Sequence, residues 1–139
     1  MAQLADFDAW CKSGPQGADI SLIDYVGFVA TPDLLFGFAS LFWPDLIVHE
    51  ERRFLASGFS PALYEQWRAK GLNSREIQRV MNHVHISTLF QNQQISDEIA
   101  VEAARLLATT WSRTLGPEGL AAEAVGSNLD DAAVTFFED

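Results

Sequence analysis

The feature that most constrains this chain is a strongly apolar stretch over residues 20–43, ISLIDYVGFVATPDLLFGFASLFW. Asp24 and the polar, proline-containing break at residues 31–33 divide it into pieces that are too short to span a bilayer. Threonine followed by proline is typical of a helix start, which predicts a helix over 32–43, before Pro44. Because apolar side chains surround this helix on nearly every side, we expect it to be buried at the centre of the fold.

The remaining elements are predicted from local patterns. β-type residues on both sides of a charged centre predict a hairpin over 46–55, with its turn near residues 50–53. Two β-type pieces near 120–125 and 132–138, separated by the turn residues Gly-Ser-Asn, predict a second hairpin. Capping residues and helical spacing predict further helices near residues 4–13, 61–70, 74–84 and 97–115. We therefore expect one α+β domain over residues 1–139, with four or five helices packed on one small antiparallel sheet that the two hairpins share.

The chain is long enough to bury a core without covalent support. A chain of 139 residues buries about two thirds of the surface that it exposes when unfolded. Cys11 is the only cysteine, so no intrachain disulfide can form, and its position beside Trp10 in an apolar helix predicts a packed side chain. The residues that we expect in the core are Leu35, Phe38, Leu41, Phe42, Trp67, Ile77, Met81, Leu107 and Trp111.

The charge is acidic and unevenly distributed. The formal net charge of −10 arises from −7 over residues 1–51, +3 over 52–114 and −6 over 115–139. Such a chain repels nucleic acid and anionic membranes, so neither is an expected partner. An acidic C-terminal hairpin could instead attract a basic protein, although a solvated surface is the ordinary interpretation of such residues. The candidate partner-binding residues are Glu118, Glu123, Asp130, Asp131, Glu138 and Asp139.

Three histidines are the only candidates for metal binding or acid–base chemistry at neutral pH. His83 and His85 lie in MNHVHIS at the end of a predicted helix, where histidine commonly packs or caps the last carbonyls. His49 begins VHEERR, which lacks the second histidine of the zinc-protease pattern His-Glu-x-x-His. A zinc site normally needs three or four protein ligands. We therefore expect no metal and no cofactor, while a site formed by His49, His83 and His85 remains the alternative.

Four segments resemble those of a known protein family. The runs SLFWPDLIVHEERRFL, ALYEQW, NHVHISTLF and VTFFED are similar to those of a family of small, uncharacterised, mostly acidic bacterial proteins. The resemblance covers roughly residues 30–139. It implies a bacterial cytoplasmic protein, and it implies no activity or catalytic residue, because none is assigned to that family.

These observations favour a function without catalysis. The sequence contains no nucleophile elbow and no glycine-rich phosphate loop, so no catalytic residues are assigned. We expect a protein-interaction domain that forms a homo-oligomer or binds a basic partner, as an immunity protein masks a toxin. The alternative is a small-ligand or metal-binding pocket around the three histidines.

Overall fold

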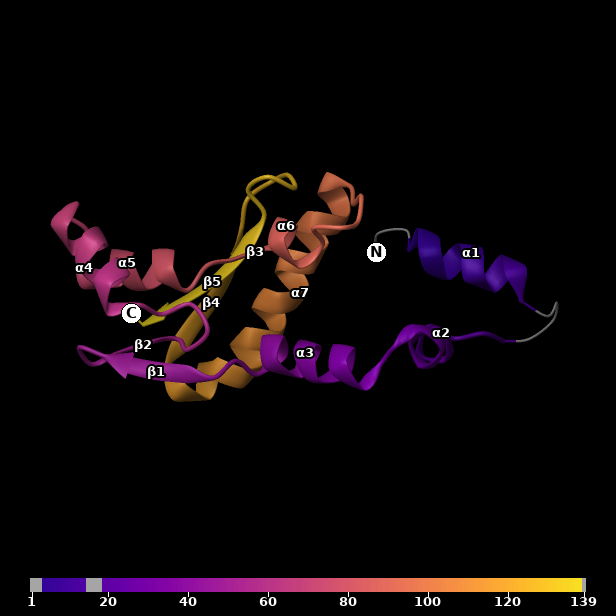
Figure 1. Ribbon diagram of the computed structural model, residues 1–139, viewed down its shortest axis with the longest axis horizontal. Helices are drawn as coiled ribbons and strands as arrows, with labels where there is room; N and C mark the ends of the chain where they lie inside the picture. The colour runs from indigo at the N-terminus through magenta and orange to yellow at the C-terminus, as the bar shows by residue number, and fades with distance from the viewer. Residues whose placement is uncertain (1–3, 15–18, 139) are drawn as a thin grey trace.

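The computed structural model describes residues 4–14 and 19–138, which form seven α-helices, one 3-10 helix and five strands. The chain is an α+β protein with two small antiparallel sheets (Figure 1). The elements are α1 Ala5–Ser13, α2 Leu22–Val29, α3 Pro32–Phe42, β1 Leu46–His49, β2 Arg52–Leu55, α4 Pro61–Ala69, α5 Ser74–Met81, β3 Val84–His85, α6 Ile86–Leu89, α7 Asp97–Leu115, the 3-10 helix η1 Gly116–Glu118, β4 Leu120–Val125 and β5 Ala133–Glu138.

Strand β5 is the centre of the larger sheet and pairs with β3 on one side and β4 on the other. Successive strand residues point to opposite faces. Phe136 packs toward α7, where its ring meets that of Trp111 edge-on at a centroid distance of 5.5 Å. Thr135 and Phe137 face α5: the Thr135 hydroxyl donates a hydrogen bond to the carbonyl of Arg79 at 2.7 Å. The guanidinium of Arg79 lies 4.5 Å from the centre of the Phe137 ring. Strand β5 is therefore buried on both faces, between α5 and α7.

Strands β1 and β2 form a separate two-stranded sheet, so the prediction that both hairpins share one sheet is wrong. This hairpin packs through Phe54 against Tyr64 of α4 and Ile77 of α5, which together form a second small core. Its turn residues Glu50 and Glu51 both adopt positive φ angles, 48° and 66°. Two consecutive left-handed residues are the geometry that a tight hairpin turn requires.

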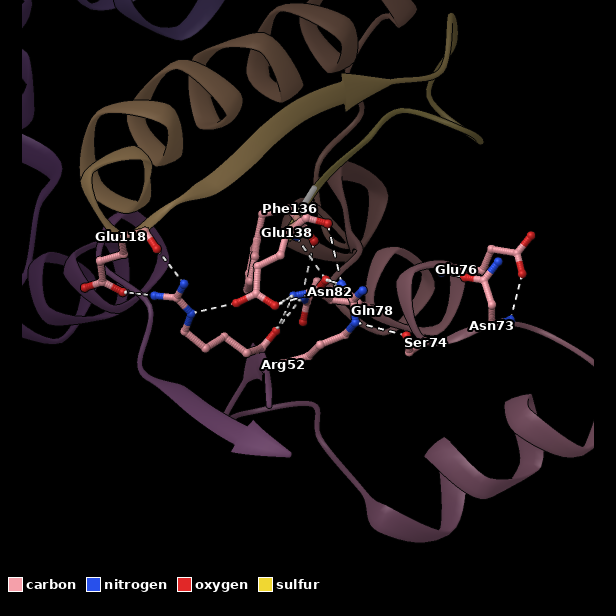
Figure 2. A network of polar contacts seen from close by, with 10 residues as sticks. Arg52, Asn73, Ser74, Glu76, Gln78, Asn82, Glu118, Phe136 and Glu138 are labelled. Carbon is pink, nitrogen blue, oxygen red and sulfur yellow. Dashed lines mark hydrogen bonds and ion pairs between the residues drawn. The ribbon is translucent and has the colours of Figure 1, made fainter. Parts of the chain in front are cut away.

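Hydrogen bonds from two side chains, instead of backbone pairing, join the two sheets. Gln78 and Asn82 lie four residues apart on α5 and its C-terminal cap, and both side chains are fully buried (Figure 2). The Asn82 amide donates hydrogen bonds to the carbonyls of Arg53 in β2 and Phe136 in β5, at 3.1 and 3.3 Å. Its carbonyl accepts one from the backbone N–H of Leu55 at 3.0 Å. Backbone groups of β2 that could have extended the sheet are therefore satisfied by side chains.

Gln78 makes the same kind of bridge one turn earlier. Its amide donates to the carbonyl of Arg53 at 3.0 Å, and its carbonyl accepts from the backbone N–H of Glu138 at 3.0 Å. The Arg52 guanidinium also donates to this carbonyl, at 2.9 Å. We name Gln78 and Asn82 together the amide clamp. It holds the β1–β2 hairpin against the end of β5.

The prediction that the 32–43 helix is the buried centre of the fold is wrong. Helix α3 contains no buried residue, and its last turn is fixed to the body of the protein. There the indole N–H of Trp111 donates to the carbonyl of Leu41 at 2.8 Å, and Leu41 and Phe42 pack against the core. Helices α1 and α2 lie beyond α3, away from the two sheets (Figure 1). The core instead centres on α7 and β5, and Leu55, Ile86 and Leu120 from other elements pack against them.

The predicted core is accordingly correct only in part. Ile77, Leu107 and Trp111 are buried, and Leu41, Phe42, Trp67 and Met81 are half-buried against the two cores. Leu35 and Phe38 are exposed, so the expectation that they are core residues is wrong. The buried residues of the main core are Leu55, Ile86, Ala100, Ala104, Leu107, Trp111, Leu115, Leu120, Ala132, Val134 and Phe136.

Candidate functional site

The most unusual surface of the protein is formed by α2 and α3, which we name the apolar arm (Leu22–Phe42). Ile23 and Phe28 of α2 are 74% and 70% exposed, and Phe36 of α3 is 70% exposed. Monomeric soluble proteins rarely expose contiguous apolar patches larger than a few hundred Å². The large apolar side chains exposed on the arm are Leu22, Ile23, Val26, Phe28, Val29, Leu34, Leu35, Phe36 and Phe38.

Local sequence explains why the arm is helical although it is not buried. Ser21 caps α2 and forms a capping box with Asp24, whose carboxylate accepts from the Ser21 hydroxyl at 2.7 Å and the Ser21 N–H at 2.9 Å. These hydrogen bonds, the side-chain one first, lower the pKa of Asp24. Thr31 caps α3 by accepting a hydrogen bond from the backbone N–H of Leu34 at 3.2 Å. The arm is therefore two preformed helices, which meet at a bend of 119°.

An apolar groove runs between α3 and the short helix α6. It has a volume of about 340 Å³. Phe38 and Leu41 line it from α3, and Leu89 and Phe90 line it from α6 and the residue after it. Asp33 is the only charged residue in its lining, and Gly37 leaves its side of the groove without a side chain. The groove suits an apolar side chain or helix face, and it offers no group for acid–base chemistry other than one carboxylate.

Half of the candidate acidic residues are engaged in ion pairs within the chain. Glu138 accepts from the Arg53 Nε at 2.9 Å, and Glu118 pairs with another nitrogen of the same guanidinium at 3.1 Å (Figure 2). Glu123 pairs with Arg79 on α5. Because these carboxylates face cations from other elements, the −6 charge of residues 115–139 is partly neutralised within the fold.

The remaining acidic candidates lie in or beyond the β4–β5 turn. Asp130 and Asp131 are exposed, and the Asp131 carboxylate accepts from the backbone N–H groups of Asn128 and Ser127 at 2.8 and 2.7 Å. Those two bonds, that from Asn128 first, lower the pKa of Asp131. Gly126 in the same turn has φ 89°, and a side chain there would collide with the Asp131 backbone. Asp139 lies outside the described residues.

His49 lies in a different environment from His83 and His85. The His49 ring packs among Phe54, Phe59 and Tyr64, with its centroid 4.6 Å from that of Tyr64. Its Nε2 is buried and has no hydrogen-bond partner among the described residues. Across residues 4–14 and 19–138, no three or more His, Cys, Asp or Glu side chains are grouped so that they could hold a metal ion.

The predicted helix over 74–84 ends earlier than expected. Helix α5 ends at Met81, and Val84 pairs with Val134 of β5 as part of strand β3. Extended backbone puts residues two apart on the same side, so the rings of His83 and His85 lie together at a centroid distance of 5.7 Å. Burial, followed by the charges of His85 and Arg79, lowers the pKa of His83.

This lowered pKa gives a testable pH dependence. The unfolded chain takes up a proton at His83 near its ordinary pKa of about 6.5, while the folded chain resists protonation. Stability should therefore fall as the pH drops through 6.5, and the loss should end below the folded pKa. Urea unfolding between pH 7.5 and 5 measures this effect. His83→Gln should remove part of the slope and change stability at pH 7.5 by only about 1 kcal/mol or less. An unchanged slope would mean that His83 titrates alike in both states.

Neither the exposure of the apolar arm nor helix α2 was predicted from the sequence. The Ser21-x-x-Asp24 capping pattern was the available signal for α2. Exposure had no comparable signal, because an apolar helix is compatible with a buried site, an interface or a membrane. In the described residues no single helix is long and apolar enough to cross a bilayer; α2 and α3 reach the required length and composition only as a bent pair.

Comparison with known proteins adds no relative from which a function could be transferred. No protein-family model, no curated protein sequence and no solved structure matches this chain. The resemblance to small acidic bacterial proteins therefore stays a prediction, and a proposal for the function has to come from the geometry of the chain itself.

Proposed function

We propose that this chain is a non-enzymatic protein-interaction protein whose binding surface is the apolar arm. The observation that carries the proposal is the exposure of nine large apolar side chains on two adjacent helices. Burying one such side chain completely contributes roughly 1.5–3 kcal/mol. A surface of this kind is stabilised when another protein covers it, and in the uncovered state it favours non-specific association.

The structure gives less support to the acidic C-terminal hairpin as the main binding surface. Glu138 has a side-chain exposure of only 19%, and its carboxylate faces Arg53 and Gln78. Glu118 and Glu123 each face an arginine. Asp130 and Asp131 remain exposed at the turn and could steer a basic partner over long range. In the proposed function, the arm supplies the contact area.

Photo-crosslinking in the native cells tests this function. A photoreactive amino acid at Phe36, in the middle of the arm, should give a discrete covalent product of higher mass. The same amino acid at Leu106, which is 60% exposed on α7 outside the arm, is the matched control and should give none. A product with a second copy or with another protein would both support binding by the arm. The absence of any product from positions 23, 28 and 36 would refute it.

A further inference from the structure

The chain exposes more surface than a compact monomer of the same mass. The protein exposes 9086 Å², whereas a compact monomer of 15.4 kDa exposes about 7,200 Å². The excess is roughly 1,900 Å², and one partner in a standard stable interface contributes about 800 Å². The excess is thus large enough for a stable complex that buries the arm, and also for the larger interface of a permanent homodimer.

The same chain carries both an apolar groove and an exposed apolar helix. The groove between α3 and α6 is lined almost entirely by apolar residues and is open to solvent. Helix α2 is a capped helix of eight residues that presents Ile23 and Val26 to solvent. Seating an apolar helix face in an apolar groove is a common mode of recognition. The chain therefore carries a groove and a helix that matches it in chemistry.

The geometry of the arm opposes insertion of α2 into the groove of its own chain. The last turn of α3 is anchored by the hydrogen bond between Trp111 and Leu41, and α2 lies off the other end of α3, where the two helices meet at a bend of 119° (Figure 1). Only Ala30 and Thr31 connect the two helices, and both have extended backbone. Helix α1 adds bulk beyond α2, since the Trp10 ring packs on Tyr25 at 5.5 Å. An unchanged arm can therefore reach a neighbouring molecule more readily than its own α6.

Charge also allows two copies to meet at this surface. The arm carries only two charged residues, Asp24 and Asp33, although the whole chain has a net charge of −10. Asp24 is already hydrogen bonded by Ser21 at the start of α2. Most of the like charge that would oppose self-association lies on other elements. A basic partner, by contrast, would find no cluster of carboxylates at the groove.

We infer that the groove between α3 and α6 receives helix α2 of a second copy of this chain, and that the exchange is reciprocal. The inference rests on the proposed function and names the partner that the arm binds. A reciprocal exchange gives a closed two-fold dimer in which the same surface of each protomer is used. Each α2 buries its apolar side chains, and each groove is filled.

Light scattering coupled to size-exclusion chromatography tests the oligomeric state of the full chain. The expected mass is twice that of the 15.4 kDa protomer at micromolar concentration. Ile23→Asp on α2 and Phe38→Asp in the groove should each weaken dimerisation by at least about 100-fold. Leu106→Asp on α7 is the matched control and should leave the dimer unchanged. Circular dichroism of each variant shows whether the monomer keeps its fold.

A disulfide between Ile23→Cys and Leu89→Cys, in a chain that also carries Cys11→Ser, distinguishes exchange from folding back. A covalent dimer on a non-reducing gel is expected. A disulfide that forms within one chain would overturn the inference. A protein that remains monomeric at a concentration of about 100 micromolar would also overturn it. Crosslinks from Phe36 to another protein alone would also overturn it, while leaving arm-mediated binding intact; no crosslink at all would refute both proposals.

Discussion

Replacing Asn82 with leucine should lower the free energy of unfolding by about 3 kcal/mol, because buried backbone groups would lose their partners. The amide of Asn82 serves Leu55, Arg53 and Phe136 simultaneously, and its side chain is fully buried. Leucine has a similar size, so it leaves little cavity and mainly removes hydrogen bonds. Urea unfolding at pH 7.5, followed by far-ultraviolet circular dichroism, measures the change.

Asn73→Ala provides the matched control on the same helix. Asn73 is exposed and caps α5 by accepting one hydrogen bond from the backbone N–H of Glu76 at 3.0 Å (Figure 2). Loss of such a cap costs about 1 kcal/mol. If Asn82→Leu cost no more than Asn73→Ala, the buried amide would not be what joins the two sheets.

Local signals in the sequence were sufficient to predict most of the elements. The 46–55 hairpin, the 120–138 hairpin and the helices that begin after Ser60, Asn73 and Ser96 are all present. Each depends on residues close together in the chain, such as a Ser-Pro start or an Asn-x-x-Glu capping box. The α+β class was predictable for the same reason.

The relation between the two hairpins could not be predicted in that way. It depends on Asn82 bonding β2 and β5, which lie 29 and 54 residues away in sequence from it. Nothing in the local pattern of a helix C-cap asparagine reveals that its side chain is buried. The hydrophobic pattern is the same whether two hairpins are joined by backbone hydrogen bonds or by side chains. Only the tertiary contacts distinguish the two cases.

The exposure of the apolar arm could not be predicted from the local pattern either. Hydrophobicity identified the 20–43 stretch as the most distinctive part of the chain, but not which molecule covers it. The burial rule assumes that a chain is covered only by itself. Apolar residues on α3 would satisfy the rule equally well if another molecule covered them, and Phe38 is 46% exposed in the single chain.

Phe136→Ala and Phe38→Ala should therefore differ sharply, although both remove a phenylalanine ring. Phe136 is fully buried against Trp111 of α7, so its loss should lower the free energy of unfolding by about 3–5 kcal/mol. In the isolated chain Phe38 is 46% exposed, and its ring is stacked on that of Phe42 at a centroid distance of 6.0 Å. Its loss should cost about 1 kcal/mol or less in a monomer. Urea unfolding at nanomolar concentration, with tryptophan fluorescence as the signal, measures both values.

Protein concentration then separates a core contact from an interface contact. The stability of a monomer does not depend on its concentration, whereas that of a dimer rises with it. Part of the loss in free energy of unfolding caused by Phe136→Ala comes from the core of the protomer. That part should be the same at every protein concentration. The cost of Phe38→Ala should grow from nanomolar to micromolar protein, because only the dimer covers its ring. A Phe38→Ala cost of 3–5 kcal/mol already at nanomolar concentration would instead place this ring in the core of the single chain. A small cost at every concentration would mean that nothing in the purified protein covers the arm.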